Sequence, residues 1–268
     1  MNAEAADAQL ARFDVKDQLM EHIGAARDHI LKRVEDPDFH THELRTRMKK
    51  TRSLLRLVVD GIPREVVNAA VARIRFLKES LASDRDAKVL YELVVDLDGD
   101  PHWIRSKTGN PAPTIVELVD GVDALALVIQ TTDFSRVDRA SMLSAFYQSY
   151  RDGRRAMGRA VKQGAADRFH TWRKRVKDLV YQSKAFGAPL NDFILQAESL
   201  AAVLGREHDL SVLLEVLEAE GKGPAPKAFI EGAIDRRKRL RKEAKEIGTE
   251  LFDRSRAAFA RWLLEHAT

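Results

Sequence analysis

The sequence contains one pattern of basic and apolar residues twice, and the second copy begins 128 residues after the first. The first copy starts at His42 and reads HELRTRMKKTRSLLR, and the second starts at His170 and reads HTWRKRVKDLVYQSK. The matching residues are His42 with His170, Arg45 with Arg173, Arg47 with Arg175, Lys49 with Lys177, and Arg56 with Lys184. Because chance rarely repeats so many positions in order, the pattern predicts an internal duplication.

Each copy has the periodicity of an amphipathic helix. With a helical step of about 100° per residue, the basic side chains fall within one arc and the apolar side chains fall opposite. The basic arc of the second copy comprises His170, Arg173, Lys177 and Lys184, with Tyr181 beside them, and its apolar side comprises Trp172, Val176, Leu179 and Phe186. We call the two basic arcs the basic stripes. One such stripe is commonly a solvated surface, and the repetition is what favours a binding site.

The remainder of the chain also predicts helices. They are expected at residues 7–34, 42–60, 64–82, 114–130, 134–163, 189–205, 209–220 and 227–266, and no segment shows the alternation of a strand. The predicted fold class is therefore all-α. Asp86 and Asp209 open similar segments in the two halves, and both are expected to cap helices.

Residues 98–113 form the clearest loop in the sequence. They contain Pro101, Gly109, Pro111 and Pro113, which interrupt regular structure. We expect this loop to link a first half, residues 7–97, to a second half, residues 114–266, within a single domain that spans residues 7–266.

The charge of the chain is modest but uneven. The formal net charge is +4, basic residues prevail from Arg151 to Lys184, and acidic residues prevail from Asn191 to Glu220. A strong local field on a nearly balanced chain indicates an anionic partner bound at one place. Arginine and lysine bind phosphate oxygens, and histidine adds hydrogen-bond donors. Nucleic acid is an alternative partner, but single-strand binders interleave aromatic residues, and the stripes contain only Tyr181.

Several kinds of site are not expected. The chain has no cysteine, which excludes disulfides and thiolate metal sites. No cluster of histidines and carboxylates accompanies the stripes, so neither a metal nor a cofactor is expected. No apolar run approaches the roughly 20 residues of a membrane span, and the N-terminal sequence does not resemble a secretory signal. We therefore expect a cytoplasmic protein without a membrane partner.

Several motifs resemble those of a known family. FHTWRKRVKDLVYQ, YRDGRRAM and LGREHDLSVL closely resemble the second half of CHAD domains (conserved histidine α-helical domains), and HELRTRMKKTRSLLR followed by RDAKVL resembles the first half. The motifs follow the family's order and cover about residues 7–266. The resemblance implies two helical bundles related by an internal pseudo-two-fold repeat. It also implies that a basic surface binds inorganic polyphosphate and that the protein associates with polyphosphate granules.

The resemblance, together with the stripes, identifies candidate polyphosphate-binding residues. They are His42, Arg45, Lys49, Arg52, Arg56, Arg85, Arg151, Arg154, Arg155, His170, Arg173, Lys177, Lys184 and His208. The two halves are not identical, because His208 stands where the first half has Arg85, and Val180 stands where it has Arg52. No catalytic residue is expected.

We therefore expect non-catalytic binding of polyphosphate in a basic cleft between the stripes. One alternative is an enzyme or accessory subunit that processes phosphate chains, although phosphoryl transfer normally needs carboxylates for Mg²⁺. Another is a nucleic-acid-binding or scaffold protein. The basic run at residues 236–242 either joins the site or forms a solvated helix face.

Overall fold

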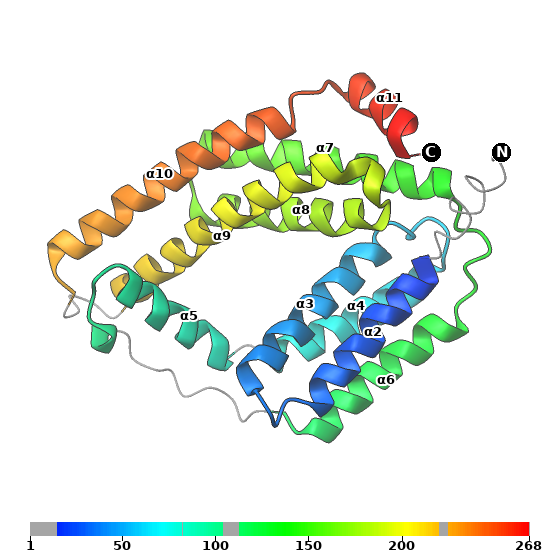
Figure 1. Cartoon of the computed structure of the whole chain (residues 1–268), viewed down its shortest axis with the longest axis horizontal. Helices are drawn as coiled ribbons and strands as arrows, with labels where there is room; N and C mark the ends of the chain where they lie inside the picture. The colour runs from blue at the N-terminus through cyan, green and yellow to red at the C-terminus, as the bar shows by residue number, and fades with distance from the viewer. Residues whose placement is uncertain (1–14, 82, 104–112, 220–224, 268) are drawn as a thin grey trace.

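The computed structural model describes residues 15–81, 83–103, 113–219 and 225–267, and all regular structure in these ranges is helical (Figure 1). The α-helices are α2 (Val15–Leu31), α3 (Pro37–Leu55), α4 (Arg64–Glu79), α5 (Ser83–Asp96), α6 (Ile115–Thr131), α7 (Arg139–Gln163), α8 (Ala166–Ala185), α9 (Asn191–Ala219), α10 (Lys227–Leu251) and α11 (Arg256–Ala267). Two 3₁₀ turns, η1 (Pro101–Trp103) and η2 (Ala188–Leu190), lie between them. The predicted all-α class is confirmed.

Local sequence explains where several helices begin and end. Asp36 caps α3 because its carboxylate accepts a hydrogen bond from the backbone N–H of Phe39 at 3.0 Å. Thr114 and Glu117 form a capping box at the start of α6. Gly164 ends α7 with a φ of 67°, a left-handed conformation that glycine adopts without a side-chain penalty. This turn allows α8 to pack back along α7.

The first bundle consists of α2, α3, α4 and α6. Helices α2 and α4 each pack against both α3 and α6. The buried face of α6 comprises Leu118, Val122, Leu125 and Ile129. The sequence-based division placed this segment in the second half, and the packing corrects it. Because the apolar face of α6 covers α2 and α4, the boundary between the two bundles along the chain falls between α6 and α7.

The second bundle consists of α7, α8, α9 and α10. Helix α8 packs between α7 and α9, α10 packs against α9 and α7, and α11 covers α7. The ring of Tyr150 on α7 stacks on Phe259 of α11, with centroids 3.6 Å apart. Aromatic burial of this kind fixes α11 even though residues 252–255 separate it from α10.

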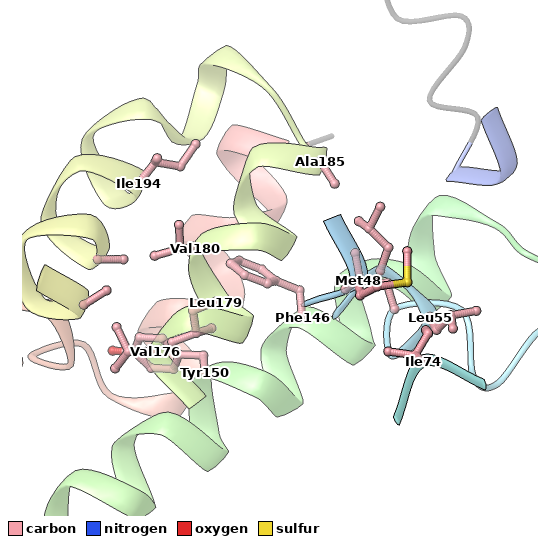
Figure 2. Close-up of a cluster of buried hydrophobic side chains, with 14 of the residues drawn as sticks. Met48, Leu55, Ile74, Phe146, Tyr150, Val176, Leu179, Val180, Ala185 and Ile194 are labelled. Carbon is pink, nitrogen blue, oxygen red and sulfur yellow. The ribbon is translucent and has the colours of Figure 1, made fainter. Parts of the chain in front are cut away.

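The two bundles share one continuous hydrophobic core. Helix α3 packs on α8, and Figure 2 shows Met48 and Leu55 of α3 close to Phe146 of α7 within this core. Trp172 and Val176, predicted on the apolar side of the second stripe, are fully buried. Because the cores merge, the two basic stripes are held by the interior of both bundles.

Helix α5 packs at the margin of this core and is buried mainly in another cluster. Its residues Leu90 and Val94 are buried against Leu213 and Leu217 of α9 in a second, smaller hydrophobic cluster. In Figure 1, α5 comes between α4 and α6 of the first bundle in sequence but lies beside the far end of α9. The chain therefore crosses from one bundle to the other before α6 returns to the first.

The structure also corrects several predicted helix boundaries. Helix α9 is continuous over Asn191–Ala219, where two helices were expected, so Asp209 lies inside it and does not cap a helix start. Contacts with α8, α10 and α5 along its length stabilise the unbroken helix. The single helix expected at 227–266 is interrupted between α10 and α11. Residues 7–14 of the first predicted helix lie outside the described ranges.

Candidate anion-binding site

The two helices that carry the basic stripes, α3 and α8, cross and are held by buried hydrogen bonds. The Ser53 hydroxyl donates to the backbone carbonyl of Asp178 at 3.1 Å, and Gln182 Nε2 donates to the backbone carbonyl of Ser53 at 3.0 Å. Ser53 and Gln182 have no solvent exposure. Breaking either bond would leave a buried polar group unsatisfied, so this crossing is strongly specified. The structure thus brings the two predicted stripe helices into direct contact.

A pair of carboxylates lies at one end of the crossing among arginines. Asp178, whose side chain is 5% exposed, lies 3.6 Å from Arg52 and 3.5 Å from Arg56 of α3. On its own helix, Arg175 is 3.9 Å away. Asp152 of α7 lies 3.9 Å from Arg56 and 4.0 Å from Arg175. We call these five residues the Asp178 end. Its two carboxylates neutralise part of the charge that three arginines bring together.

A second group of cations lies at the other end of the crossing. Burial, followed by the charges of Arg47 and Lys184, lowers the pKa of Lys50. Burial, followed by the charges of Lys50 and Arg47, lowers the pKa of His22 to about 4. His22 is therefore neutral near pH 7, and its Nδ1 accepts a hydrogen bond from Arg47 Nη1 at 3.2 Å. Lys184 forms an ion pair with Glu198. We call His22, Arg47, Lys50 and Lys184 the Lys50 end.

Two predicted histidines, one from the second stripe and one from α9, lie together. The rings of His170 and His208 lie against each other in a tilted arrangement, with centroids 4.1 Å apart and an interplanar angle of 31°. Burial, followed by the charges of His208, Lys174 and Arg173, lowers the pKa of His170 to about 4. Burial, followed by the same arginine and lysine, lowers the pKa of His208 to about 4. Both rings are therefore neutral near pH 7.

Further cations gather beside the crossing from three helices. Burial, followed by the charges of Arg52, Arg45 and Lys174, lowers the pKa of Lys78 on α4. These side chains come from α3, α4 and α8, so the positive potential is not the property of one solvated helix face. Like charges that depress one another's pKa values favour the approach of an anion.

Two stripe residues also make contacts within the protein. Arg45 Nη1 donates to the backbone carbonyls of Lys78 at 3.1 Å and Leu81 at 2.9 Å, and it thereby stabilises the end of α4. Lys177 Nζ lies 5.9 Å from the centroid of the Tyr181 ring, and burial lowers the pKa of this lysine. Arg45 is therefore partly a structural residue, a role that the stripe alone does not indicate.

The three predicted arginines of α7 have different surroundings. Arg155 Nη1 lies 3.8 Å from Asp152 and so adjoins the Asp178 end. Arg154 Nη1 donates to a backbone carbonyl in the segment between α10 and α11 at 3.0 Å. Arg151 Nη1 donates to Gln148 on its own helix at 3.0 Å. Of the three, Arg155 alone adjoins the ion pairs of the α3–α8 crossing.

Three further predicted residues are His42 and Lys49 on α3 and Arg85 on α5. The side chain of His42 is 47% exposed and lies 4.0 Å from Glu43. Lys49 is half-buried on α3. Arg85 belongs to α5, but its side chain lies outside the described residues.

Sequence reasoning missed the residues that organise the crossing. Asp152 and Asp178 read as ordinary solvated acids, because nothing in a basic amphipathic segment marks one carboxylate as buried. Lys50 and Lys174 lie off the stripes by one residue and were passed over for that reason. The repeat itself contained a signal, since Asp178 corresponds to Lys50 in the first copy.

Neither a metal centre nor a membrane span is found. In the ranges that the structure describes, no group of three or more histidine, aspartate or glutamate side chains is arranged to hold a metal ion. Over the same ranges, no helix is both long and apolar enough to cross a membrane.

Comparisons with known proteins identify a family. Neither the curated proteins nor the solved structures contain a match to this chain. The family model described as the CHAD domain matches residues 17–218, which include both basic stripes, the α3–α8 crossing and the paired histidines. The chain therefore belongs to the CHAD domain family.

Proposed function

We propose that this protein binds inorganic polyphosphate without reacting with it, through the basic surface around the α3–α8 crossing. The observation that carries the proposal is the crowding of cations from different helices. Lys50, Lys78 and Lys177 all have pKa values lowered by burial and by neighbouring positive charges. A protein gains nothing in stability from such crowding, so a bound polyanion is its simplest physical explanation.

The chemistry of these side chains suits phosphate. Arginine guanidinium groups meet two phosphate oxygens at once, and lysine ammonium groups adapt as mobile point charges. Arginines and lysines follow one another along α3 and α8, which matches a ligand that repeats one charged group. Membership of the CHAD family, with which polyphosphate binding is associated, supports the same ligand. Association with polyphosphate granules follows from this proposal.

We also propose that the two bundles are related by a pseudo-two-fold repeat. Helix neighbours correspond in the two bundles: α2 packs on α3 as α7 packs on α8, and α4 packs on α6 as α9 packs on α10. Arg56 contacts Asp178. In the repeat, Arg56 corresponds to Lys184 and Asp178 corresponds to Lys50. Lys184 in turn lies close enough to Lys50 for its charge to lower the pKa of that lysine. A two-fold relationship predicts this exchange of contacts.

Two alternatives remain distinct from this proposal. A nucleic acid would satisfy the same charges, but Tyr181 is the single aromatic residue of the stripes, and base stacking normally needs more. An enzyme that processes phosphate chains would use the same cations to stabilise charge in its transition state. Each alternative makes a different prediction in a binding or turnover assay.

The test is a titration of the full-length protein with long-chain polyphosphate, followed by calorimetry at several salt concentrations. If many phosphates are neutralised together, affinity falls steeply as salt rises. The double variant Arg173→Gln, Lys177→Gln should lose at least about tenfold in affinity, as expected for the loss of two charge-assisted contacts. Circular dichroism would verify that its helices remain intact.

The matched control is Lys238→Gln, Arg239→Gln on α10, which also removes one lysine and one arginine. Both side chains belong to the basic run and are exposed. Equal losses in the two double variants would place the site on α10 or spread it over the whole surface. Displacement of polyphosphate by single-stranded RNA at matched charge would favour the nucleic-acid alternative. Release of phosphate from polyphosphate by the pure protein with Mg²⁺ would favour the enzyme.

A further inference from the structure

The two ends of the α3–α8 crossing correspond in sequence but differ in charge. A shift of 128 residues relates Arg175 to Arg47 and Lys184 to Arg56, so cations are kept at both positions. The same shift relates Asp178 to Lys50. The carboxylate that pairs with arginines at the Asp178 end is therefore replaced by a cation at the Lys50 end.

The second carboxylate of the Asp178 end is also missing from the Lys50 end. Asp152, which contacts Arg56 and Arg175, corresponds to Gly24 on α2. A Cβ atom added to Gly24 would meet nothing within 4 Å, so Gly24 faces open space. The Lys50 end therefore has no equivalent of either Asp178 or Asp152.

The charges facing the Lys50 end come from four helices. Glu21 of α2 and Glu43 of α3 raise the pKa of Lys50, but burial and the charges of Arg47 and Lys184 outweigh them. Glu198 of α9 pairs with Lys184. Throughout the described part of the chain, no carboxylate is within ion-pair distance of Lys50 or Arg47. The three acids therefore match Arg47, Lys50 and Lys184 in number, but the only one of them that pairs with a cation of the Lys50 end among the described residues is Glu198.

Arg47 retains unused hydrogen-bonding capacity. Its Nη1 donates to His22, but its Nε is buried and has no hydrogen-bond partner among the described residues. A buried guanidinium N–H without an acceptor is unfavourable unless a ligand supplies one. Because His22 is neutral, it does not add a further charge that an anion would have to offset.

We propose that the Lys50 end is an anion subsite, in which a phosphate group held by Arg47, Lys50 and Lys184 takes the place that the Asp178 carboxylate occupies at the other end. The inference deepens the proposed function, on which its choice of polyphosphate as ligand rests. The Asp178 end is filled by the protein's own carboxylates and contributes less to binding. The affinity of the basic surface is therefore concentrated at one end of the crossing.

The test converts the Lys50 end into a copy of the Asp178 end. Lys50→Asp supplies an internal carboxylate between Arg47 and Lys184, and polyphosphate affinity is expected to fall about ten- to hundredfold, the equivalent of one or two charge-assisted contacts. The melting temperature of the unliganded variant should not fall, because crowded like charges are replaced by an ion pair. Lys50→Gln removes the charge alone and tests the site if aspartate is not tolerated.

The matched control is Lys242→Asp on α10, which changes the net charge equally. Its side chain is 81% exposed and lies 4.0 Å from Glu246. Polyphosphate affinity of this variant should change less than about threefold, as expected for a screened distant charge. If Lys50→Asp and Lys50→Gln both bind like the wild type, or if Lys242→Asp loses as much as Lys50→Asp, the subsite is wrong.

A second probe separates this inference from the proposed function. Pyrophosphate should raise the melting temperature of the wild-type protein and leave that of Lys50→Asp unchanged. If polyphosphate fails to bind the wild type but pyrophosphate shows this difference, the proposed function is wrong and the anion subsite stands. If neither anion affects the wild type, both are overturned.

Discussion

The imidazole rings of His170 and His208 lie in tilted contact with their centroids 4.1 Å apart, although the two residues come from different helices. Burial lowers the pKa values of both rings most, and the charges of Arg173 and Lys174 of α8 lower them further. Two imidazolium ions at this separation would repel each other strongly. The pair is therefore kept neutral, and its protonation is coupled to any anion that approaches the two cations.

This coupling predicts how stability depends on pH. Each imidazole has a pKa of about 4 in the folded protein, against an ordinary value of 6.5. Between these pH values the unfolded chain binds more protons than the folded protein, so the free energy of unfolding rises with pH and levels off above about 6.5. In the double variant His170→Gln, His208→Gln, the melting temperature should fall less than in the wild type as pH decreases from 6.5 to 4. Identical pH profiles would show that the rings are not buried as a neutral pair.

The same pair predicts proton uptake when a polyanion binds. A bound polyphosphate chain offsets the charges of Arg173 and Lys174, and it should raise the pKa values of His170 and His208. Affinity should therefore increase as pH falls through the range between the bound and the free pKa values, and it should level off below the free values of about 4. Calorimetry in buffers of different ionisation enthalpy measures the protons taken up. Equal uptake by the wild type and the double glutamine variant would place the titrating groups elsewhere.

The Asp178 end predicts opposite effects on stability and binding. Asp178→Asn leaves Arg52, Arg56 and Arg175 without their buried counter-ion, and we expect a loss of about 1–3 kcal/mol in the free energy of unfolding, measured in urea. Affinity for polyphosphate should rise, because a competing negative charge is removed. Asp152→Asn is the comparison: its side chain is 36% exposed, and it should cost less than about 1 kcal/mol. A weaker affinity in Asp178→Asn would mean that the network positions the binding arginines.

Two glycines of α10, Gly248 and Gly232, should respond oppositely to replacement by alanine, because only Gly248 is packed closely against another side chain. A Cβ atom on Gly248 would lie 2.6 Å from Cζ2 of Trp172, whose side chain is fully buried. Gly248→Ala should therefore destabilise the protein by about 1–3 kcal/mol through overpacking. Gly232 on the same helix faces open space, and Gly232→Ala should stabilise by up to about 1 kcal/mol. Thermal unfolding of both variants checks the difference in sign.

Arg241, in the basic run at 236–242, has a structural role, so its replacement should destabilise the protein more than replacement of an exposed arginine of the same run. Arg241 Nε lies 2.8 Å from Glu207, a glutamate with 1% exposure. Arg241→Met should cost about 2–4 kcal/mol because it leaves a buried charge unpaired, whereas the exposed Arg239→Met should change stability by less than about 0.5 kcal/mol. Neither should alter polyphosphate binding. Weaker binding in Arg239→Met would bring the basic run into the site.

The all-α class was predictable because helical periodicity is a local property. Trp172 and Val176 were correctly placed in the core from spacing alone. The continuous helix α9 was not predicted, since Asp209 has the composition of a helix start and the packing of α8, α10 and α5 overrides it. The pairing of α6 with the first bundle was missed for a similar reason, because the loop at 98–113 resembles a boundary.

The candidate site was predictable in the cations of the stripes, but not in Lys50, Lys174 or the counter-ions. The stripes identified Arg52 and Arg56, but their partner Asp178 belongs to the other half of the chain. Such a pair depends on the angle at which two helices cross, and side-chain spacing within one helix contains no information about it. The family resemblance identified His170 and His208 as candidate residues, but their separation along the chain gave no indication that the two rings lie together.

Helix α5 is buried mainly in the small hydrophobic cluster, and this has a consequence for local unfolding of the protein. Leu90 and Val94 are buried in the small cluster with α9, while Leu93 and Leu97 touch both this cluster and the main core. Few apolar contacts therefore have to break for α5 to detach, and its backbone amides should exchange with deuterium sooner than those of α3 and α8. We therefore expect two cooperative units of unequal size, of which the smaller one unfolds locally while the crossing that bears the basic residues stays closed.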